Sequence, residues 1–393
     1  MPENKRYKCC FILNIDLDLP VSDVHLIMDV INTFNRKDVL VIKKGKTEHL
    51  NIDDTRIVSI VPKKVAKKNL IGRYFADLNY YNKVKRFLKN NKVIANSYFI
   101  QSGPVAYFIA KHLKKKTKAR VVYNAQDVFP DNIIGNSFIK SIMFSPFSLL
   151  SKKLYRTVDH TITISDSIKE TLIKKRVSAD KISVVHNWAK KEDETFPIIN
   201  FKEKYQLEDK FVVLYAGNIG KFQNVKMILE VAKLVSNSEI VFVIQGDGIE
   251  RKELEKIATD NKIKNVLFLP QVPLVYMPGT YRAVDINLVT LKPTIYKTAL
   301  PSKLAFCLNT NVPLLITIEK EASIRNILVN DELSSFIDPN DVDSLKNEIL
   351  KIYNNRYNEK KGVNRSIILK EYFDNTNNPI KYNMVLNIQE QKE

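Results

Sequence analysis

The sequence predicts an α/β protein made of two doubly wound domains, each built on a parallel β-sheet. Short, nearly continuous apolar runs alternate with amphipathic helical patterns along most of the 393 residues, as is typical of parallel strands buried on both faces. The pattern restarts after a polar stretch at residues 190–210, and a chain of this length exceeds the usual size of one hydrophobic core. We therefore predict a first domain over residues 1–190 and a second over residues 191–362, facing a central cleft where such sheets bind ligands.

The first domain is expected to begin with an apolar strand. This strand, CCFILNI at residues 9–15, precedes a pattern whose apolar residues recur on one helical face from residue 21 to residue 34. Further expected strands and helices alternate after it: VLVIKK (39–44), RIVSIV (56–61), KVIANS (92–97), a helix over 105–113, ARVVYNA (119–125), a long helical segment over 137–155, HTITIS (160–165) and KISVVHN (181–187).

The polar connection lacks the residue pattern of a strand. After it, the second domain again alternates strands and helices. Its expected elements are FVVLYAG (211–217), a helix from Asn224, IVFVIQGDG (240–248), a helix from Ile249, VLFLP (266–270), DINLVTL (285–291), a helix after Pro301, VPLLITI (312–318) and a helix from Asp341.

The charge balance favours an anionic partner. The chain has 62 Lys and Arg against 43 Asp and Glu, a formal charge of +19, which suits nucleic acid, a phosphorylated small molecule or an acidic membrane surface. Neither interleaved aromatic and basic residues of the RNA-binding kind nor a helix-turn-helix pattern occurs, so we expect no nucleic acid partner.

The segment at residues 138–156 mixes apolar and basic residues. It fits an anionic membrane surface and a core helix with a solvated edge equally well.

The cysteines and the first residues favour a cytoplasmic protein. Three cysteines, two of them adjacent at Cys9 and Cys10, provide no disulfide framework and no metal-binding spacing. The N-terminal apolar run is interrupted before any cleavage site, which indicates a strand rather than a signal peptide. No window approaches the roughly 18 apolar residues of a membrane span.

Two turns of the second domain are candidate phosphate or nucleotide contacts. AGNIGKFQN (216–224) passes from a strand into a helix, and Gly217 and Gly220 can leave backbone amides open to an anion. It matches neither the P-loop nor the G-x-G-x-x-G pattern, so a purely structural turn is as well supported. Gly246 and Asp247 end the next strand ahead of Arg251. Taken alone, they indicate a tight turn more than a nucleotide contact.

Polar residues also follow strands of the first domain. Asp127 and Asp131 lie in NAQDVFPD (124–131), where a carboxylate can orient a hydroxyl or take part in acid–base chemistry. Capping of the loop explains them equally well. Asn187 ends the last strand, beside His186.

The order of these motifs resembles the GT-B glycosyltransferases of glycosyltransferase family 4, particularly bacterial capsule and O-antigen enzymes of the L-fucosamine type. YNAQDVFPD resembles the family's acceptor-side strand end, YAGNIGKFQNV its donor phosphate loop, and LPSKLAF (300–306) its donor-site helix. VFVIQGDGIERKELE and VLFLPQV, which ends at Val272, resemble the segments that hold the nucleotide base. In this family two Rossmann-like domains face each other, and residues 363–388 could supply the helix that often returns to the first domain.

The resemblance implies transfer of a hexosyl or N-acetylhexosaminyl group from a nucleotide donor, usually UDP-linked, with retention and without a metal or other cofactor. The acceptor would be a hydroxyl of a lipid-linked or polysaccharide-precursor glycan at the inner membrane face. A cation and backbone amides can stabilise the diphosphate that leaves. The donor-binding residues that the resemblance implies are Gly217, Asn218, Gly220, Gly246, Asp247, Arg251, Val272, Ser302 and Lys303. Lys303 would neutralise the diphosphate and Asp127 would help to position the acceptor hydroxyl, with Asp131 and Asn187 on the acceptor side.

The chain departs from the family pattern in the donor-site helix and after it, besides milder departures at Asn218 and Gln223 and the lack of a glycine-rich N-terminal loop. Phe306 aligns with the glutamate that binds the ribose hydroxyls, and Asn311 aligns with a glycine. A phenylalanine cannot accept hydrogen bonds from hydroxyls. The alternative is therefore a non-catalytic GT-B homologue that binds a partner transferase or a glycan.

Overall fold

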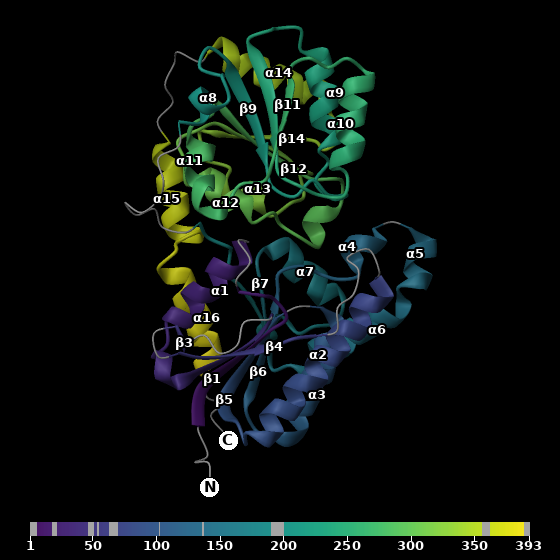
Figure 1. Cartoon of the computed structure of the whole chain (residues 1–393), viewed down its shortest axis with the longest axis vertical. Helices are drawn as coiled ribbons and strands as arrows, with labels where there is room; N and C mark the ends of the chain where they lie inside the picture. Colours follow the sequence, from purple (N-terminus) through teal and green to yellow (C-terminus); the bar gives the residue numbers. More distant parts are fainter. Residues whose placement is uncertain are drawn as a thin grey trace. The chain divides into compact units, whose positions relative to one another are not determined.

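The computed structural model describes residues 6–17, 22–45, 51–52, 55–62, 70–101, 103–135, 137–189, 200–355 and 362–388 (Figure 1). The chain divides into two compact units. Unit 1 comprises Met1–His186 together with Thr376–Glu393, and unit 2 comprises Asn187–Asn375. Residues 190–199 of the predicted connection lie outside the described residues.

Unit 1 is built on an eight-stranded sheet with the order β3-β4-β2-β1-β5-β6-β7-β8. All neighbouring strands are parallel except the β3–β4 pair. The strands are β1 (Arg6–Leu13), β2 (Val39–Lys44), β3 (Asn51–Ile52), β4 (Thr55–Ile60), β5 (Ile94–Gln101), β6 (Arg120–Ala125), β7 (His160–Thr163) and β8 (Ile182–Val184). The α-helices are α1 (Ser22–Asn32), α2 (Leu70–Asn90), α3 (Tyr107–Lys116), α4 (Asp131–Ile134), α5 (Phe138–Met143), α6 (Ser145–Thr157), α7 (Asp166–Lys174) and α16 (Asn377–Asn387).

Helices cover both faces of this sheet. Figure 1 shows α1 and α16 on one side and α2, α3 and α6 on the other. The central strand β1 is buried from Cys9 to Leu13, because its apolar side chains meet helices on both faces. Cys9 and Cys10 are free thiols in this strand.

The last helix of the chain, α16, completes unit 1. Its Tyr382 hydroxyl donates to Asn124 Oδ1 at 3.3 Å, and Arg120 Nε donates to the main-chain oxygen of Val385 at 2.9 Å. Asn378 Nδ2 donates to the main-chain oxygen of His186 at 3.0 Å. These bonds join the two ends of the sequence within one core.

Unit 2 is built on a six-stranded sheet with the order β11-β10-β9-β12-β13-β14, in which all neighbours are parallel. The strands are β9 (Phe211–Ala216), β10 (Ile240–Gln245), β11 (Val266–Leu269), β12 (Ile286–Thr290), β13 (Leu314–Thr317) and β14 (Ser334–Ile337). The α-helices are α8 (Phe201–Lys204), α9 (Lys226–Leu234), α10 (Arg251–Asp260), α11 (Met277–Arg282), α12 (Lys303–Leu308), α13 (Ile324–Ile327), α14 (Val342–Asn354) and α15 (Val363–Tyr372).

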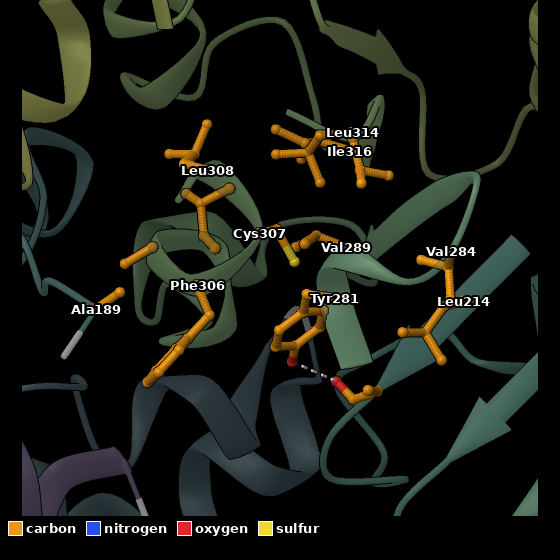
Figure 2. Close-up of a cluster of buried hydrophobic side chains, with 14 of the residues drawn as sticks. Ala189, Leu214, Tyr281, Val284, Val289, Phe306, Cys307, Leu308, Leu314 and Ile316 are labelled. Carbon is orange, nitrogen blue, oxygen red and sulfur yellow. Dashed lines mark hydrogen bonds between the residues drawn. The ribbon is translucent and has the colours of Figure 1, made fainter. Parts of the chain in front are cut away.

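Two separate hydrophobic clusters lie on the two faces of this sheet. Alternate residues of β9 divide between them: Leu214 belongs to the cluster with α11 and α12 (Figure 2), and Tyr215 to the cluster with α9, α10 and α14. Successive side chains of a strand point to opposite faces, so both faces of the sheet are buried. The predicted pair of doubly wound α/β domains is confirmed.

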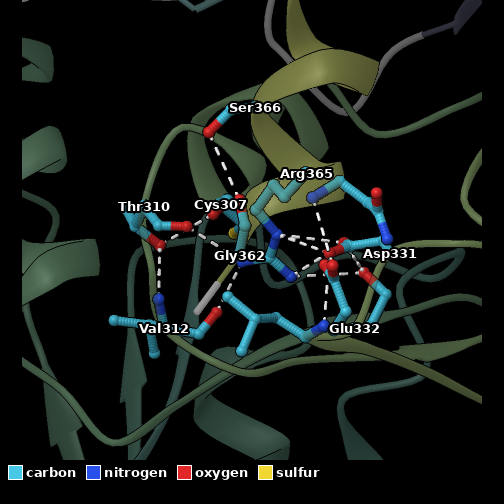
Figure 3. Close-up of polar contacts among 11 residues, drawn as sticks. Cys307, Thr310, Val312, Asp331, Glu332, Gly362, Arg365 and Ser366 are labelled. Carbon is cyan, nitrogen blue, oxygen red and sulfur yellow. Dashed lines mark hydrogen bonds and ion pairs between the residues drawn. The ribbon is translucent and has the colours of Figure 1, made fainter. Parts of the chain in front are cut away.

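Helix α15 belongs to unit 2, so that of residues 363–388, which could supply a helix returning to the first domain, only those from Thr376 onward belong to unit 1. Arg365 and Asp331 form an ion pair at 2.9 Å whose side chains are 1% and 0% exposed. Arg365 Nη1 also donates to the main-chain oxygens of Thr310 and Val312 at 2.9 and 2.7 Å (Figure 3). Removing one member of a buried pair leaves a costly uncompensated charge, so this network holds α15 on unit 2, and the chain passes to unit 1 only after Asn375.

Among the described residues, no helix combines the length and apolar character needed to span a membrane.

Candidate functional site

The loops that follow β9 and β10 pack directly on one another at the carboxyl end of the unit 2 sheet. Gly217 N donates to Gln245 O at 2.9 Å, and Ile219 N donates to Asp247 O at 2.8 Å. Glu250 N in turn donates a hydrogen bond to Ile219 O at 3.1 Å. The two turns singled out in the sequence therefore form one continuous backbone surface.

Two glycines make this close approach possible. Gly246 has φ +144°, and a Cβ atom there would lie 1.9 Å from Gly217 O. A Cβ atom on Gly248 would lie 2.2 Å from Ile219 O. Because both obstacles are backbone atoms that cannot rotate away, no other residue fits either position without moving the loop after β9.

Lys303, the first residue of α12, reaches toward the loop after β9. Its ammonium nitrogen lies 3.3 Å from the centroid of the Tyr215 ring, a cation–π contact. A Cβ atom built on Gly217 would lie 3.8 Å from the same nitrogen, so the absent side chain leaves room beside it. The structure thus brings together Gly217 and Lys303, both predicted from the sequence, and adds Tyr215.

The Lys303 ammonium is enclosed by protein and has no hydrogen-bond partner among the described residues. Burial lowers the pKa of Lys303 from 10.5 to about 7, with Cys307 opposing the shift. Burial raises the pKa of the Cys307 thiol to about 12, so this neighbour is uncharged at neutral pH. A buried cation without a counter-ion favours an anion that enters beside it.

The other predicted donor residues of these loops have different environments. Asn218 is exposed, and its main-chain oxygen accepts from the Tyr215 hydroxyl at 2.7 Å. Asp247 is also exposed, and its carboxylate accepts from Gly248 N at 2.8 Å. Gly220 follows in the same turn as Asn218.

Arg251 supports the loop after β10 through three bonds. Its Nη1 donates to Gly246 O and, at 2.7 Å, to Leu269 O, while its Nε donates to Glu255 at 2.7 Å. These bonds give Arg251 a structural function. Its predicted contact with the donor stays a prediction.

Val272 and Ser302 both belong to unit 2. Val272 follows β11 and is partly exposed, and Ser302 directly precedes α12. Because α12 has only six residues, its dipole adds little, and the anion-binding argument depends on the Lys303 ammonium.

The predicted acceptor residues have different local environments. Asp127 is exposed after β6 and accepts from Asn132 Nδ2 at 3.2 Å. Asp131 forms an ion pair with Lys175 at 2.7 Å. Asn187 is 8% exposed and belongs to unit 2, three residues before the predicted domain boundary.

The structure also shows features that the sequence analysis missed. Lys43, at the carboxyl end of β2, is 1% exposed and lies 3.2 Å from Asp16, which follows β1. A lysine within a buried apolar strand was the available signal, because such a residue needs a counter-charge. The corresponding signal for Tyr215 was its place two residues before Gly217 at the end of β9.

Phe306 packs in the hydrophobic cluster of unit 2. It is 4% exposed, and its ring centroid lies 6.4 Å from that of Tyr281 (Figure 2). The position that aligns with the family's ribose-binding glutamate therefore contributes apolar packing. Across the described ranges, no group of three His, Cys, Asp or Glu side chains could hold a metal ion.

Comparison with known proteins identifies both halves of the chain. Residues 36–192 match the model of glycosyltransferase family 4, and residues 198–367 match that of the group 1 glycosyl transferases. The chain is 29% identical over 256 residues to WbjE of Pseudomonas aeruginosa, named as a candidate glycosyltransferase, covering 63% of each protein. It is 28% identical over 216 residues to WcaI of Escherichia coli (strain K12), named as a candidate colanic acid biosynthesis glycosyl transferase, covering 53% of each.

A solved structure shares the fold. The Anabaena protein HepE, crystallised in complex with UDP and glucose, superposes with a TM-score of 0.73 at 13% identity, covering 97% of this chain and 99% of HepE. The chain therefore contains a glycosyltransferase family 4 domain followed by a group 1 glycosyl transferase domain, and its two doubly wound units share the fold of the GT-B glycosyltransferases.

Proposed function

We propose that this protein transfers a sugar from a nucleotide donor, with UDP as the nucleotide, and that the donor diphosphate binds beside Lys303. The enclosed Lys303 ammonium next to Gly217 carries the proposal, because it lacks a counter-ion in the part of the chain that the structure describes. The fold shared with HepE, whose crystals contain UDP and glucose, supports the choice of nucleotide.

In this mechanism the departing diphosphate gains negative charge as the glycosidic bond to the donor breaks. We propose that the Lys303 ammonium, which has no hydrogen-bond partner among the described residues, stabilises that charge. We propose that this cation serves in place of a metal, and that transfer of a hexosyl or N-acetylhexosaminyl group proceeds with retention. Asp127, exposed after β6, would accept the hydrogen bond of the acceptor hydroxyl.

The acceptor that we propose is a lipid-linked or polysaccharide-precursor glycan at an anionic membrane surface. The name of WcaI, which refers to colanic acid biosynthesis, supports a polysaccharide. Helix α5 supports the membrane: all six of its residues are exposed, among them Phe138, Ile139, Ile142 and Met143 at 61–79%. No Asp or Glu occurs between Asp131 and Asp159, whereas the same segment contains Lys140, Lys152, Lys153 and Arg156. Exposed apolar and cationic side chains together suit an anionic bilayer.

The experiment that tests the donor site is calorimetric titration with UDP and a panel of UDP-sugars. We expect saturable binding that weakens by at least about tenfold in Lys303→Ala, because a hydrogen bond to a charged group is lost. Lys233→Ala is the matched control, since Lys233 is an exposed lysine of α9 that donates to Asn261. No heat with any nucleotide would contradict the proposal.

The second candidate function is a non-catalytic subunit that binds a partner transferase or a glycan, and Phe306 in the hydrophobic cluster favours it. Transfer to water or to an acceptor distinguishes the two functions. A chain that binds UDP but releases no sugar from any UDP-sugar would support the second.

A further inference from the structure

Unit 1 contains a large cavity at the amino ends of its strands. The cavity has a volume of about 1040 Å³ and is bordered by the first residues of three strands, Arg6 of β1, Ile94 of β5 and Arg120 of β6. The carboxyl ends of α2, α3 and α16 complete its wall. Its volume is that of a pocket for a small molecule.

The cavity is strongly cationic. Among the described residues, two arginines and five lysines line it, against a single carboxylate, that of Asp159. The Asp159 carboxylate forms an ion pair with Lys114 at 2.7 Å and accepts a hydrogen bond from Val121 N at 2.8 Å. Three of the lysines, Lys92, Lys116 and Lys118, are exposed and have no ion pair within the described ranges of the chain.

Lysines at helix ends often do no more than offset the helix dipoles, and three helices end here. Each helix end contributes roughly half a negative charge, so the three together offset only about one and a half of the positive charges. A surplus of several positive charges is left around one concave surface. Such a surplus costs free energy unless an anion binds.

This cavity is separate from the proposed site of sugar transfer. Arg120 begins β6, whereas Asp127 follows its end. The six residues of β6 span roughly 20 Å at about 3.3 Å per residue. A ligand in the cavity therefore lies at the amino ends of the unit 1 strands, whereas Asp127 lies beyond the carboxyl end of β6.

The side chains favour phosphate over carboxylate groups. Arginine forks suit carboxylate and phosphate groups alike, but both arginines already use Nε within the protein: Arg6 donates to Asn96 at 3.2 Å and Arg120 to Val385 O at 2.9 Å. The free lysines are flexible point charges that suit phosphate oxygens. Buried apolar side chains such as Leu113 and Leu386 also line the cavity.

We infer that this cavity of unit 1 is a binding site for a small ligand that carries two or more phosphate groups. The site is distinct from the donor site and is assigned by the seven cationic side chains that line one concave space. The inference does not depend on the proposed transferase activity.

The test is a calorimetric titration with inorganic tripolyphosphate at about 0.15 M salt, where long-range attraction is screened beyond roughly 8 Å. All titrations use the full chain with Lys303→Ala, so that binding at the proposed donor site is weakened. We expect one saturable site, weakened by at least about tenfold when Lys116→Ala and Lys118→Ala are added.

The matched control adds Lys174→Ala and Lys181→Ala instead, which removes two exposed lysines of unit 1 that do not line the cavity. We expect this control to bind tripolyphosphate unchanged. Absence of saturable binding, or equal weakening in both variants, would overturn the inference. Tighter binding of polygalacturonate than of tripolyphosphate at the same lysines would overturn the assignment to phosphate.

Discussion

At the scale of single residues, Lys303 has the environment most unlike that of an ordinary surface lysine. The sequence predicted its function from the order of motifs, with Pro301 and Ser302 before it. It could not predict the Tyr215 ring at 3.3 Å or the enclosure of the ammonium, because these depend on how α12 packs against β9 and its loop. The consequence is a lysine whose pKa is lowered to about 7.

This pKa predicts that donor binding weakens as the pH rises above 7. In the free protein Lys303 loses its proton near pH 7, whereas a bound diphosphate favours the charged form and raises the pKa. Binding must therefore be accompanied by proton uptake at higher pH, and the affinity for UDP is expected to fall by about tenfold between pH 8 and pH 9. Calorimetry across this range measures the effect, since the phosphate of UDP titrates near pH 6.

Lys303→Arg provides the control for this pH dependence. A guanidinium stays charged throughout the range, so its affinity for UDP, whatever the absolute value, is expected to be constant from pH 7 to pH 9. An equally flat profile in the unsubstituted protein would show that titration of Lys303 does not govern binding.

At the scale of elements, the function of the glycines in the loops after β9 and β10 could not be predicted from the motif alone. The sequence allowed Gly246 and Gly248 to be either a tight turn or a nucleotide contact. In the structure, both positions must be glycine because the backbone of Gly217 and Ile219 lies too close for a side chain. No local sequence pattern encodes this contact, because it joins residues about 30 positions apart. The sequence left the unit of helix α15 open for the same reason, since its buried partner Asp331 is 34 positions away.

Helix α5 carries a prediction of its own. If its exposed face inserts into an anionic bilayer, then Ile139→Ser with Ile142→Ser should reduce binding to vesicles of phosphatidylglycerol and phosphatidylethanolamine by about tenfold or more, because two large apolar side chains lose their burial. These residues are 79% and 62% exposed, so the fold should tolerate both changes. Sedimentation of the protein with vesicles measures the bound fraction.

The matched control for α5 is Val329→Ser with Val363→Ser, which changes two apolar side chains of unit 2 that are 70% and 61% exposed. This variant should bind the vesicles as the unsubstituted protein does. Equal loss in both variants, or equal binding to vesicles of phosphatidylcholine alone, would contradict docking of α5 on an anionic surface.

At the scale of the whole molecule, alternating strands and helices were enough to predict two parallel sheets. The order of apolar runs specified both cores, since each run is buried wherever it falls in a sheet. The division of the chain into units was harder to predict from the sequence. Unit 1 takes its last helix from the far end of the sequence, through bonds such as that from Arg120 to Val385, 265 positions apart. Pairings of that separation leave no periodic signal in either segment.

This connectivity predicts that removing residues 376–393 destabilises unit 1 and spares unit 2. The deletion strips Tyr382 and Leu386, each 2% exposed, from the unit 1 core, so its thermal transition should fall by more than about 10 °C. The unit 2 transition is identified as the one that UDP raises, and it should keep both its midpoint and its response to UDP. A chain lacking only residues 389–393 keeps α16 and is the control. If the longer deletion left both transitions in place, the bonds from α16 to β6 would not contribute to the stability of unit 1.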